Sequence, residues 1–501
     1  MNLATRVLVS AGVHASAART PRKIALRCAD ESVDYASLSV RIQRVTGGLQ
    51  QAGLRHGECV ALLAPNCIEY PEILLGIADA GGVAVTLNPR FTTAEILSAS
   101  RDCSARWLFV HSACGEHELD RLATVFEKII FIDQDYPSWR DASPLGTPDE
   151  TLADTDPFTL VYSSGTTGKP KGITLSHRSR ALTFHAMAME YGCYGPDDYQ
   201  LGIAPMAHGA GFAFIMASIF FGGSVDILPK FDPEQVLSKL RLEAFTGVFM
   251  VPTHYQNIFA LPGSVLGRYR GGMPALRSII SNAAALPQHL KQKIVDYFGE
   301  GLLHETYGST EAGIVTNLRP QYQLSKERSV GPAFALNHIQ LLNDAGEPVA
   351  PGEVGELYSR SPYLFNGYWN QPEETAAVLR DGWLTAGDLA KVDEDGFFYI
   401  VDRKKDMVVS GGLNIYPREI EEVLAAHPAI KESAVIGIPD EQWGEALRAY
   451  VVLRADKHVS TQELDAHCRQ VLAGYKVPRD YRYIGTLPRN AGGKVLKREL
   501  A

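Results

Sequence analysis

The 501-residue sequence has few cysteines, no long apolar run and no excess of positive charge. Its seven cysteines are odd in number, scattered, and never arranged as C-x-x-C, which argues against a disulfide framework and a zinc site and favours a reducing compartment. The formal net charge of -9 makes nonspecific nucleic-acid binding an unfavourable hypothesis. These absences leave the ordinary soluble globular class, with more than one domain at this length.

Two segments could suggest a membrane or export signal, and neither fits well. Residues 209–225 carry no charge, but the segment is rich in glycine, so we expect a buried helix followed by a buried strand. Near the N-terminus, Ser10, Gly12 and His14 interrupt a very short apolar stretch, unlike the core of a signal peptide. We therefore expect no membrane span and a cytoplasmic location.

What the sequence does contain is a glycine-rich run at residues 162–172, Tyr-Ser-Ser-Gly-Thr-Thr-Gly-Lys-Pro-Lys-Gly. Glycines let the backbone approach an anion closely, while hydroxyls and lysines supply donors and charge, so the run is typical of a phosphate-binding loop. It is no P-loop, because Ser163 stands where the first glycine belongs and Pro170 follows Lys169. Apolar residues on both sides favour a loop between two strands; a flexible surface linker is the alternative.

Strand and helix patterns alternate along the first 300 residues, which predicts a large multi-layer α/β domain with mainly parallel sheets. Near residue 400 a strand pattern runs into five charges, Asp402 to Asp406, and a domain boundary is plausible there. We expect a large domain over 1–401 and a small, mobile α+β domain over 402–501. The expected strands of the large domain are 59–63, 83–87, 107–110, 158–162, 173–175, 223–228, 248–251 and 278–281, and its expected helices are 37–52, 68–80 and 93–100.

Several further motifs follow the glycine-rich run in a fixed order. They are Tyr-Gly-Ser-Thr-Glu at 307–311, Gly-Trp-Leu-Thr-Ala-Gly-Asp-Leu at 382–389, Asp-Arg-Lys at 402–404, Gly-Gly at 411–412 with Asn-Ile-Tyr-Pro at 414–417, and the terminal segment 490–497. Together with the run, they resemble the adenylate-forming superfamily of acyl-CoA synthetases, firefly luciferase and peptide-synthetase adenylation domains. The resemblance covers nearly the whole chain.

The resemblance implies ATP-dependent activation of a carboxylic acid to an acyl-AMP, with release of pyrophosphate. Thr310 would donate to the α-phosphate and Glu311 would hold Mg²⁺, although both could instead cap a helix. Lys494 would bridge the acid and the α-phosphate, His208 would lie beside them, and Arg403 would contact ribose or phosphate. The implied ATP and AMP residues are Ser163, Ser164, Gly165, Thr166, Thr167, Gly168, Lys169, Ala283, Ala284, Tyr307, Gly308, Thr310, Asp388, Arg403 and Lys494.

The second implied step transfers the acyl group to coenzyme A after the small domain rotates about a hinge at Asp402. Gly411 and Gly412 would let the pantetheine arm pass bare backbone, and Trp443 and Tyr475 would line the nucleotide end of CoA. A buried Trp or Tyr is, however, more often part of a core.

The implied acyl pocket contains no carboxylate that could pair with an α-amine, so amino acids are disfavoured. Asn282 departs from the family's usual glycine, and Ala386 stands where Thr or Ser is common; the first leaves the substrate open. An aromatic, alicyclic or medium-chain acid is the expectation. The implied pocket residues are Met206, His208, Gly211, His254, Asn282, Gly308 and Gly313.

Three functions remain open at this point. The first is an AMP-forming acyl-CoA ligase that uses ATP, Mg²⁺ and coenzyme A. The second is a stand-alone adenylating enzyme that loads a carrier protein, and the third is a non-enzymatic sensor. A small-molecule acid is the expected partner, and a homodimer is common among relatives.

Overall fold

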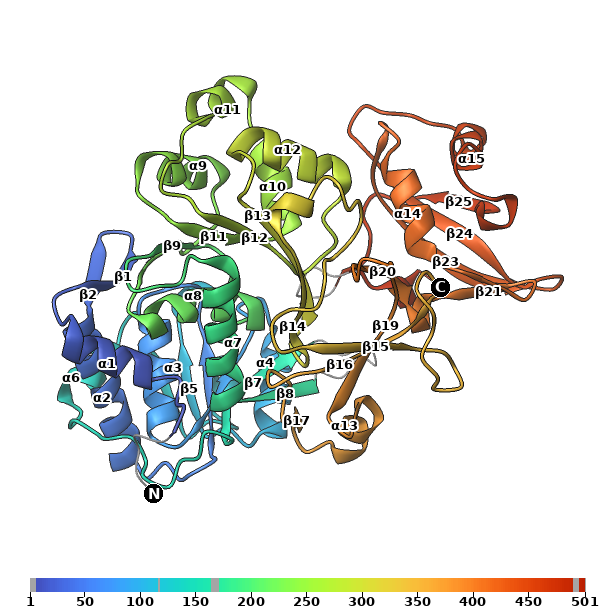
Figure 1. Ribbon diagram of the computed structural model, residues 1–501. Coiled ribbons are helices and arrows are strands. Elements are labelled where there is room, and N and C mark those ends of the chain that lie inside the picture. Colours follow the sequence, from blue (N-terminus) through green and yellow to red (C-terminus); the bar gives the residue numbers. More distant parts are fainter. Residues whose placement is uncertain (1–5, 116–117, 164–170, 490–494, 501) are drawn as a thin grey trace. The chain divides into compact units, whose positions relative to one another are not determined.

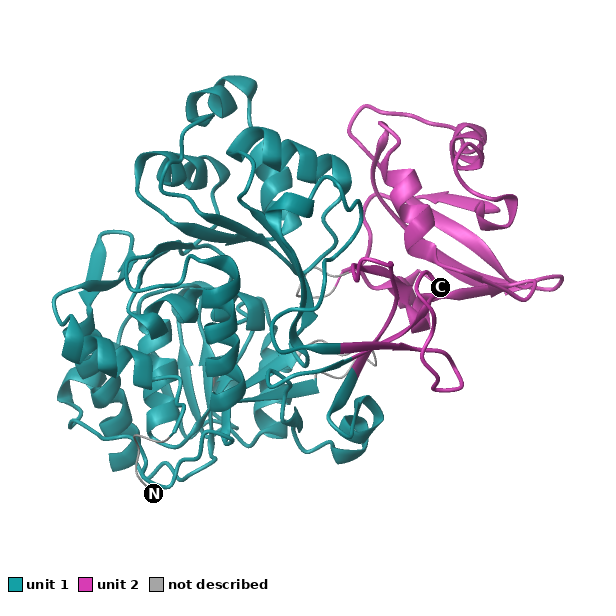
Figure 2. Ribbon diagram, in the orientation of Figure 1, with its two compact units in different colours: residues 1–338, 359–384 teal, residues 339–358, 385–501 magenta. Residues whose placement is uncertain are grey.

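A computed structural model describes residues 6–115, 118–163, 171–489 and 495–500, with the Ser163 side chain excepted. The chain forms two compact units (Figure 2), and each is described by itself. Unit 1 comprises residues 1–338 and 359–384, and unit 2 comprises residues 339–358 and 385–501. The unit boundaries therefore fall inside strands, at Tyr358 in β16 and at Leu384 in β19.

The larger sheet of unit 1 has the strand order β14-β13-β12-β11-β9-β10-β1-β2. The central pairs are parallel, while β14 and β2 are antiparallel to their neighbours at the two edges. The bounds are β1 Ile24–Cys28, β2 Glu31–Asp34, β9 Tyr199–Gly202, β10 Ser224–Ile227, β11 Gly247–Met250, β12 Ser278–Ser281, β13 Leu303–Ser309 and β14 Gly313–Leu318.

The second sheet of unit 1 has the order β17-β8-β7-β4-β3-β5-β6. Its strands β3 to β7 pair in parallel, and β8 returns antiparallel to β7 and to β17. The bounds are β3 Cys59–Leu63, β4 Val83–Thr86, β5 Trp107–Val110, β6 Lys128–Phe131, β7 Pro157–Ser163, β8 Lys171–Ser176 and β17 Gly367–Tyr368. The glycine-rich run thus lies between two antiparallel strands, as its flanks predicted.

Helices cover these sheets in layers that follow from the apolar pattern (Figure 1). One core joins side chains of both sheets with those of α1, α2, α3, α7 and α8, so these helices pack between the sheets. A second core joins the other face of the larger sheet to α9, α10 and α12. The bounds are α1 Ala11–Arg19, α2 Tyr35–Gln51, α3 Glu69–Asp79, α4 Thr93–Asp102, α5 Leu119–Leu122, α6 Tyr136–Ala142, α7 His177–Tyr191, α8 Gly209–Phe221, α9 Pro233–Leu242, α10 Pro252–Phe259, α11 Gly263–Tyr269, α12 Gln288–Phe298 and α13 Pro372–Val378.

Local signals explain where several helices begin. The Asp34 carboxylate accepts a hydrogen bond from the Ser37 amide at the start of α2, and Thr92 and Glu95 form a reciprocal capping box at α4. The apolar residues 209–225 form buried helix α8 and then strand β10, as predicted. Among the described residues, no helix is long and apolar enough to cross a membrane.

A third sheet has the order β15-β16-β19-β18, in which β20 also pairs with β19; β18 belongs to unit 1, and most of the other strands belong to unit 2. Unit 2 also contains a second sheet with the order β22-β21-β24-β23, in which β25 pairs with β24. Helices α14 and α15 pack on the second sheet through one apolar core. The bounds are β15 His338–Leu342, β16 Gly355–Arg360, β18 Leu379–Arg380, β19 Trp383–Val392, β20 Phe398–Arg403, β21 Val408–Ser410, β22 Leu413–Ile415, α14 Pro417–Ala425, β23 Ile430–Asp440, β24 Gly444–Leu453, α15 Thr461–Arg469 and β25 Asp480–Tyr483.

The fold class is confirmed: a large, mainly parallel α/β part is followed by a smaller α+β part. The compact units nevertheless divide the chain differently from the predicted boundary at Asp402, because residues 339–358 and 385–401 cluster with the C-terminal segment. A division into compact units does not show whether the small domain rotates, so the hinge at Asp402 stays a prediction.

Candidate active site

The Tyr-Gly-Ser-Thr-Glu motif forms the end of β13 and the turn into β14 at an edge of the larger sheet. The Ala312 amide donates to the Ser309 hydroxyl at 3.0 Å, which closes the turn. The Thr310 side chain faces the N-terminus of α8, since a Cβ built on Gly209 would lie 3.5 Å from Thr310 Oγ1. Neither Thr310 nor Glu311 caps a helix, so the alternative reading of these residues is wrong.

Glu311 is held by a tyrosine that the sequence analysis did not single out. The Tyr368 hydroxyl donates to Glu311 Oε1 at 3.0 Å, and the Phe365 amide donates to the Glu311 carbonyl at 2.8 Å. Burial, and then the Glu311 charge, raise the pKa of Tyr368, so this hydroxyl keeps its proton and stays a donor. Because β17 pairs with β8, this contact joins Glu311 to the strand that follows the glycine-rich run.

Lys171, the first residue of β8, extends this cluster. Its ammonium lies 5.0 Å from the centre of the Tyr368 ring and pairs with Glu374. Glu374 thus pairs directly with the end of the run, and Glu311 is linked to it through Tyr368. In the described part of the chain no three His, Cys, Asp or Glu side chains group as a metal site. One carboxylate still fits Mg²⁺ well, because this ion commonly takes its other ligands from water and substrate phosphates.

Ala283, Ala284 and Tyr307 come together at one sheet edge. Strands β12 and β13 are parallel neighbours with Ser281 opposite Glu305, so the two segments leave the sheet side by side. Ala283 has φ of +77°, a conformation that L-residues seldom adopt. Such backbone strain is typical of functional segments.

Strand β13 pins this segment at both ends. Asn282 Nδ2 donates to Thr306 Oγ1 at 2.5 Å, and the Leu286 amide donates to Glu305 Oε1 at 3.1 Å. Glu305 also forms a buried ion pair with Lys291 of α12. Asn282 is larger than the glycine expected at this position from the family resemblance. Its side-chain amide is hydrogen-bonded to Thr306 and is therefore not simply free to line a pocket.

The loop before α8 contains Met206 and His208. Asn66, which follows β3, accepts from the Met206 amide at 2.9 Å and donates to carbonyl oxygens of residues 203, 204 and 228. His208 occupies the N-cap position of α8, and its Nε2 lies 3.5 Å from Asn88 Nδ2. Burial and then nearby Arg90 lower the pKa of His208, so the ring is neutral at pH 7. Asn66 and Asn88 were missed from the sequence.

Backbone packing requires the glycines of the implied acyl pocket. A Cβ on Gly211 would lie 2.1 Å from the Pro205 carbonyl oxygen, and one on Gly308 would lie 2.0 Å from the Gly313 carbonyl oxygen. Gly313 has φ of +69°. These glycines are needed for the local fold whether or not they also border an acid.

An apolar cavity of about 10 Å³ lies behind Gly211, between α8 and the larger sheet. Its aromatic wall is a stacked pair, with the rings of Phe214 and Phe249 4.1 Å apart. The full lining is Gln200, Leu201, Gly202, Ile203, Ala204, Gly211, Phe214, Ile215 and Phe249.

His254 lies in α10 and packs its ring on Phe231, with the centroids 4.3 Å apart. Its Nδ1 accepts from the Val251 amide at 3.3 Å, which leaves Nε2 as the protonated donor. Burial lowers the pKa of His254 to about 4, so the ring is uncharged at neutral pH. Its direct approach to an acid stays a prediction.

Within unit 2, Asp388 and Arg403 lie opposite each other on β19 and β20. Arg403 Nε is 3.6 Å from Asp388 Oδ1, and the Asp388 residue is largely buried. The next residue, Lys404, binds Asp344 and Glu356, and these two carboxylates raise its pKa. The structure therefore brings together Asp388 and Arg403, two of the residues implied to bind the nucleotide.

Asp402, the predicted hinge, caps a helix in unit 2. Its Oδ2 accepts from the Arg418 amide at 2.9 Å, in the first turn of α14, and its Oδ1 accepts from the Arg403 amide at 2.8 Å. A carboxylate at a helix N-terminus is favourable because the free amides and the helix dipole are both positive there.

The predicted CoA residues Gly411 and Gly412 form the tight turn between β21 and β22. Their φ angles are +58° and +77°, the pattern that strongly favours glycine in a two-residue hairpin. The Gly411 amide donates to the Trp443 carbonyl at 2.8 Å, and a Cβ on Gly411 would lie 2.7 Å from the indole ring. Trp443 is therefore packed directly on this turn.

Cations border the same surface. The Arg479 guanidinium lies 5.0 Å from the centre of the Trp443 ring, and Lys476 Nζ lies 5.8 Å from the centre of the Tyr475 ring. Trp443 and Tyr475 are 36% and 47% exposed, so neither is a core residue. Lys476 donates to both carboxylate oxygens of Glu419, at 3.0 and 2.7 Å, so the charge of Lys476 is balanced within the protein.

Several predicted residues lie outside the described part of the chain. They are Ser164, Gly165, Thr166, Thr167, Gly168, Lys169 and Lys494, together with the Ser163 side chain. Arg489 and Val495, on either side of residues 490–494, form an antiparallel bridge. The roles of the residues in these segments stay predictions.

Comparisons with known proteins agree with this geometry. Residues 13–369 match the family model described as AMP-binding enzyme, and residues 419–494 match the AMP-binding enzyme C-terminal domain. A feruloyl-CoA synthase of Amycolatopsis is 37% identical over 486 residues, which is 96% of each chain. A long-chain-fatty-acid–CoA ligase of Bacillus subtilis is 35% identical, over 97% of this chain and 92% of the relative.

Solved structures show the same likeness. An o-succinylbenzoate CoA synthetase from Bacillus subtilis, in complex with the acyl-adenylate intermediate OSB-AMP, superposes with a TM-score of 0.89. The two chains are 29% identical, and the match covers 98% of this chain and 97% of that one. A second structure of this enzyme, in complex with ATP and magnesium ion, has a TM-score of 0.87 and 29% identity over 98% of each chain.

Proposed function

The chain belongs to the AMP-binding enzyme family, and from this premise we propose that it joins an aromatic, alicyclic or medium-chain carboxylic acid to coenzyme A through an acyl-AMP intermediate. It is an AMP-forming acyl-CoA ligase that uses ATP, Mg²⁺ and coenzyme A. The observation that carries the proposal is the turn at Thr310 and Glu311, tied through Tyr368 to the strand after the glycine-rich run.

In the first step, the acid's carboxylate attacks the α-phosphorus of ATP, and pyrophosphate leaves. Two anions must approach each other, so the site needs cations and oriented donors more than a nucleophilic side chain. Thr310 donates to the α-phosphate, and Lys494 neutralises charge between the acid and that phosphate. Glu311, with its Tyr368 donor, would hold Mg²⁺, which supplies charge neutralisation to the departing phosphates when bound.

Further residues are proposed to contact the base and the ribose of the nucleotide. Tyr307 stacks on the adenine beside Ala283 and Ala284, since an aromatic face suits a flat base. Asp388 accepts from the ribose hydroxyls because an ionised carboxylate offers only acceptors. Arg403, whose Nε lies 3.6 Å from Asp388 Oδ1, helps to hold that carboxylate in place.

In the second step, the CoA thiol attacks the carbonyl carbon of the acyl-AMP, and AMP leaves. Gly411 and Gly412 present bare backbone to the pantetheine arm. Arg479, stacked on exposed Trp443, is suited to the phosphates at the nucleotide end. Rotation about Asp402 would replace the residues of the adenylation step by those of the CoA step. During this rotation either the Asp402 cap on α14 is broken, or α14 moves together with Asp402.

The acid class rests on the relatives. Those at 30% identity or more are named for ferulate, a long-chain fatty acid and 2-succinylbenzoate, all acids with apolar bodies. Loading of a carrier protein is the alternative, and exposed Trp443 and Tyr475 would be part of either acceptor surface.

A panel assay tests the proposal. Acid-dependent pyrophosphate release is measured with ferulate, cinnamate, benzoate, cyclohexanecarboxylate, hexanoate and palmitate, each with coenzyme A, with a phosphopantetheinylated carrier protein, or with neither. We expect release that depends on the acid and thioester formation with coenzyme A. Thioester formation only on the carrier protein would establish the alternative, and no acid-dependent release from any acid would overturn the proposal.

A further inference from the structure

Arg180, in the first turn of α7, is a buried cation without a carboxylate partner among the described residues. The residue is 3% exposed, and its Nη2 donates to the Tyr363 carbonyl oxygen at 2.9 Å. Its Nε is buried and meets no hydrogen-bond partner in the described part of the chain. Within the part of the chain that the structure describes, Arg180 forms no ion pair.

An arginine in this state is costly to the fold. Guanidinium groups stay protonated in proteins, and a buried charge without a partner lowers stability by several kcal/mol. Burial alone lowers the pKa of Arg180 to about 10, so the side chain is still charged at neutral pH. The fold therefore carries a positive charge that its own described residues do not balance.

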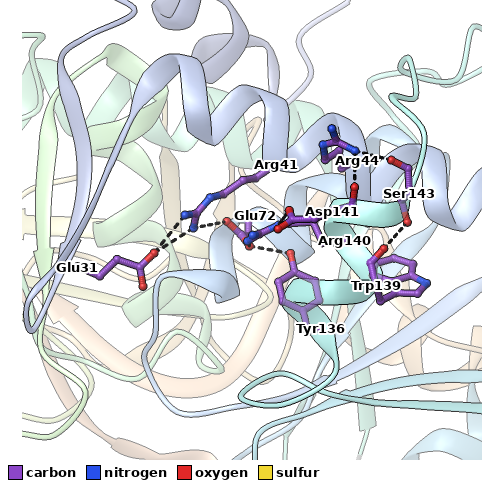
Figure 3. A network of polar contacts seen from close by, with 9 residues as sticks. All are labelled: Glu31, Arg41, Arg44, Glu72, Tyr136, Trp139, Arg140, Asp141 and Ser143. Atoms are coloured by element: carbon purple, nitrogen blue, oxygen red, sulfur yellow. Dashed lines mark hydrogen bonds and ion pairs between the residues drawn. The ribbon is translucent and has the colours of Figure 1, made fainter.

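The same unit shows how it buries an arginine for structural purposes. Arg140 reaches buried Glu72 at 3.0 Å and Asp141 at 2.8 Å, and Arg41 approaches Glu72 from the other side at 3.4 Å (Figure 3). The Tyr136 hydroxyl also donates to Glu72 at 2.7 Å. In this network Arg140 and Arg41 each have a carboxylate, whereas Arg44, which is not fully buried, donates to the carbonyl oxygens of Asp141 and Ser143. Fully buried Arg180 meets only a neutral carbonyl oxygen among the described residues.

The position of Arg180 points to the acid. A Cβ built on Gly313 would lie 2.8 Å from Tyr363 Cβ and 3.7 Å from Arg180 Nη2, so Gly313 packs on Tyr363 and lies close to this guanidinium. Gly313 follows directly on the Thr310–Ala312 turn and belongs to the acyl pocket implied by the sequence. Arg180 is thus a neighbour of a residue of that implied pocket.

We propose that Arg180 recognises a second anionic group on the acid, so that the preferred substrate is a dicarboxylic acid with an apolar body. This inference rests on the proposed function and narrows its substrate class. One carboxylate of the substrate reacts at the α-phosphate, and the other supplies the counter-charge that Arg180 lacks. A guanidinium binds a carboxylate in a charge-assisted and often bidentate manner, which is stronger than an ordinary hydrogen bond.

A guanidinium could equally bind a phosphate of ATP, so the experiment distinguishes a substrate carboxylate from an ATP phosphate. Three variants are compared with the wild type: Arg180→Met, which removes the charge at similar length, Arg180→Lys, which keeps it, and Arg178→Met. Arg178 is the control because it lies on the same helix, is exposed, and is already paired with Asp154 at 2.7 Å. The probes are matched acids, 4-carboxycinnamate with cinnamate and adipate with hexanoate.

The expected result is a change in preference. Wild type should favour the diacid of each pair in kcat/KM by about tenfold or more, as a charge-assisted contact predicts. Arg180→Met should abolish or reverse this preference, mainly through KM for the diacid, and Arg180→Lys should restore part of it. The KM for ATP with the monoacids should not change, and Arg178→Met should behave as wild type.

Stability gives an independent readout. Removal of an unbalanced buried charge should leave the melting temperature of Arg180→Met equal to wild type or higher, and the diacid should raise the melting temperature of wild type only. A lower melting temperature with equal losses for both members of each pair would show a structural role and overturn the inference. A higher KM for ATP with every acid would assign Arg180 to phosphate and overturn it as well. No activity with any acid, in wild type too, would instead refute the proposed function.

Discussion

Two glycine-containing turns, one in each unit, are built in opposite ways. The turn between β13 and β14 in unit 1 is closed by Ser309, tied to Tyr368 through Glu311, and packed on Tyr363. The turn between β21 and β22 in unit 2 projects Gly411 and Gly412 between Val409 and Leu413, which are 42% and 48% exposed. The first is suited to hold reacting groups in place, and the second to receive a flexible arm.

Under the proposed function, activation takes place at the β13–β14 edge of unit 1 and coenzyme A is accepted at the β21–β22 surface of unit 2. One residue does not follow this division of the two steps between the units. Lys494 belongs to unit 2 by sequence, yet its predicted role is in the activation step. Predictions that separate the two steps therefore test the division directly.

The largest expected effect is that of Lys494→Ala. Acyl-adenylate formation, measured as acid-dependent pyrophosphate exchange, should fall by roughly 10²-fold or more, because a transition-state charge contact is lost. Transfer from preformed acyl-AMP to coenzyme A should be nearly unchanged. Lys497→Ala is the control, since Lys497 is paired with Glu421 at 2.7 Å. Adenylation near the wild-type rate in Lys494→Ala would remove this role.

Gly411→Ala should affect the other step. The substitution combines φ of +58° with a Cβ 2.7 Å from Trp443, so the turn must shift. We expect acyl transfer to coenzyme A to slow by about tenfold, a cost typical of backbone strain, while pyrophosphate exchange stays as in wild type. Gly396→Ala is the matched control, because Gly396 also has positive φ, +83°, but no atom near its Cβ position. Equal loss in both steps would contradict the division.

A smaller effect is expected from Tyr368→Phe. Loss of the 3.0 Å hydrogen bond to Glu311 should lower adenylation by about threefold to tenfold, as expected for a bond to a charged group. The loss should be partly recovered at high Mg²⁺ if Glu311 holds the ion. Tyr363→Phe serves as a control, because its hydroxyl donates to the Ala335 carbonyl instead. An unchanged Mg²⁺ dependence would argue against Glu311 as the ligand.

The last prediction concerns the dependence of stability on pH. Burial lowers the pKa of His177, His254 and His304 in unit 1 to about 4 each. The unfolded chain therefore binds more protons between pH 6.5 and 4, and stability should fall as pH falls through this window, by up to about 1.4 kcal/mol per pH unit for each histidine. His254→Phe, which keeps a ring on Phe231, should reduce the loss measured by urea unfolding from pH 7 to pH 5 by about 2 kcal/mol. An unchanged loss would show that His254 does not titrate in this way.

Much of the fold was predictable from pattern alone. Strands β3, β5 and β12 begin and end at the predicted residues, because short apolar runs bounded by polar residues mark buried parallel strands. The ordered motifs also predicted Thr310, Glu311 and Asp388 as site residues. Asn66, Asn88 and Tyr368 escaped prediction, since each acts through contacts with residues more than 50 positions away in the sequence.

The sequence by itself determined the family, the chemistry and the order of the binding elements, because glycine turns, phosphate donors and carboxylates must occur at local spacings that motifs preserve. The tertiary structure decided which charges are balanced. Arg140 and Arg180 look alike in the sequence, yet only Arg140 meets a carboxylate once helices α3 and α6 pack together. Charge balance depends on distances between distant segments, and the glycine-rich run that identifies the nucleotide carries no information about the acid.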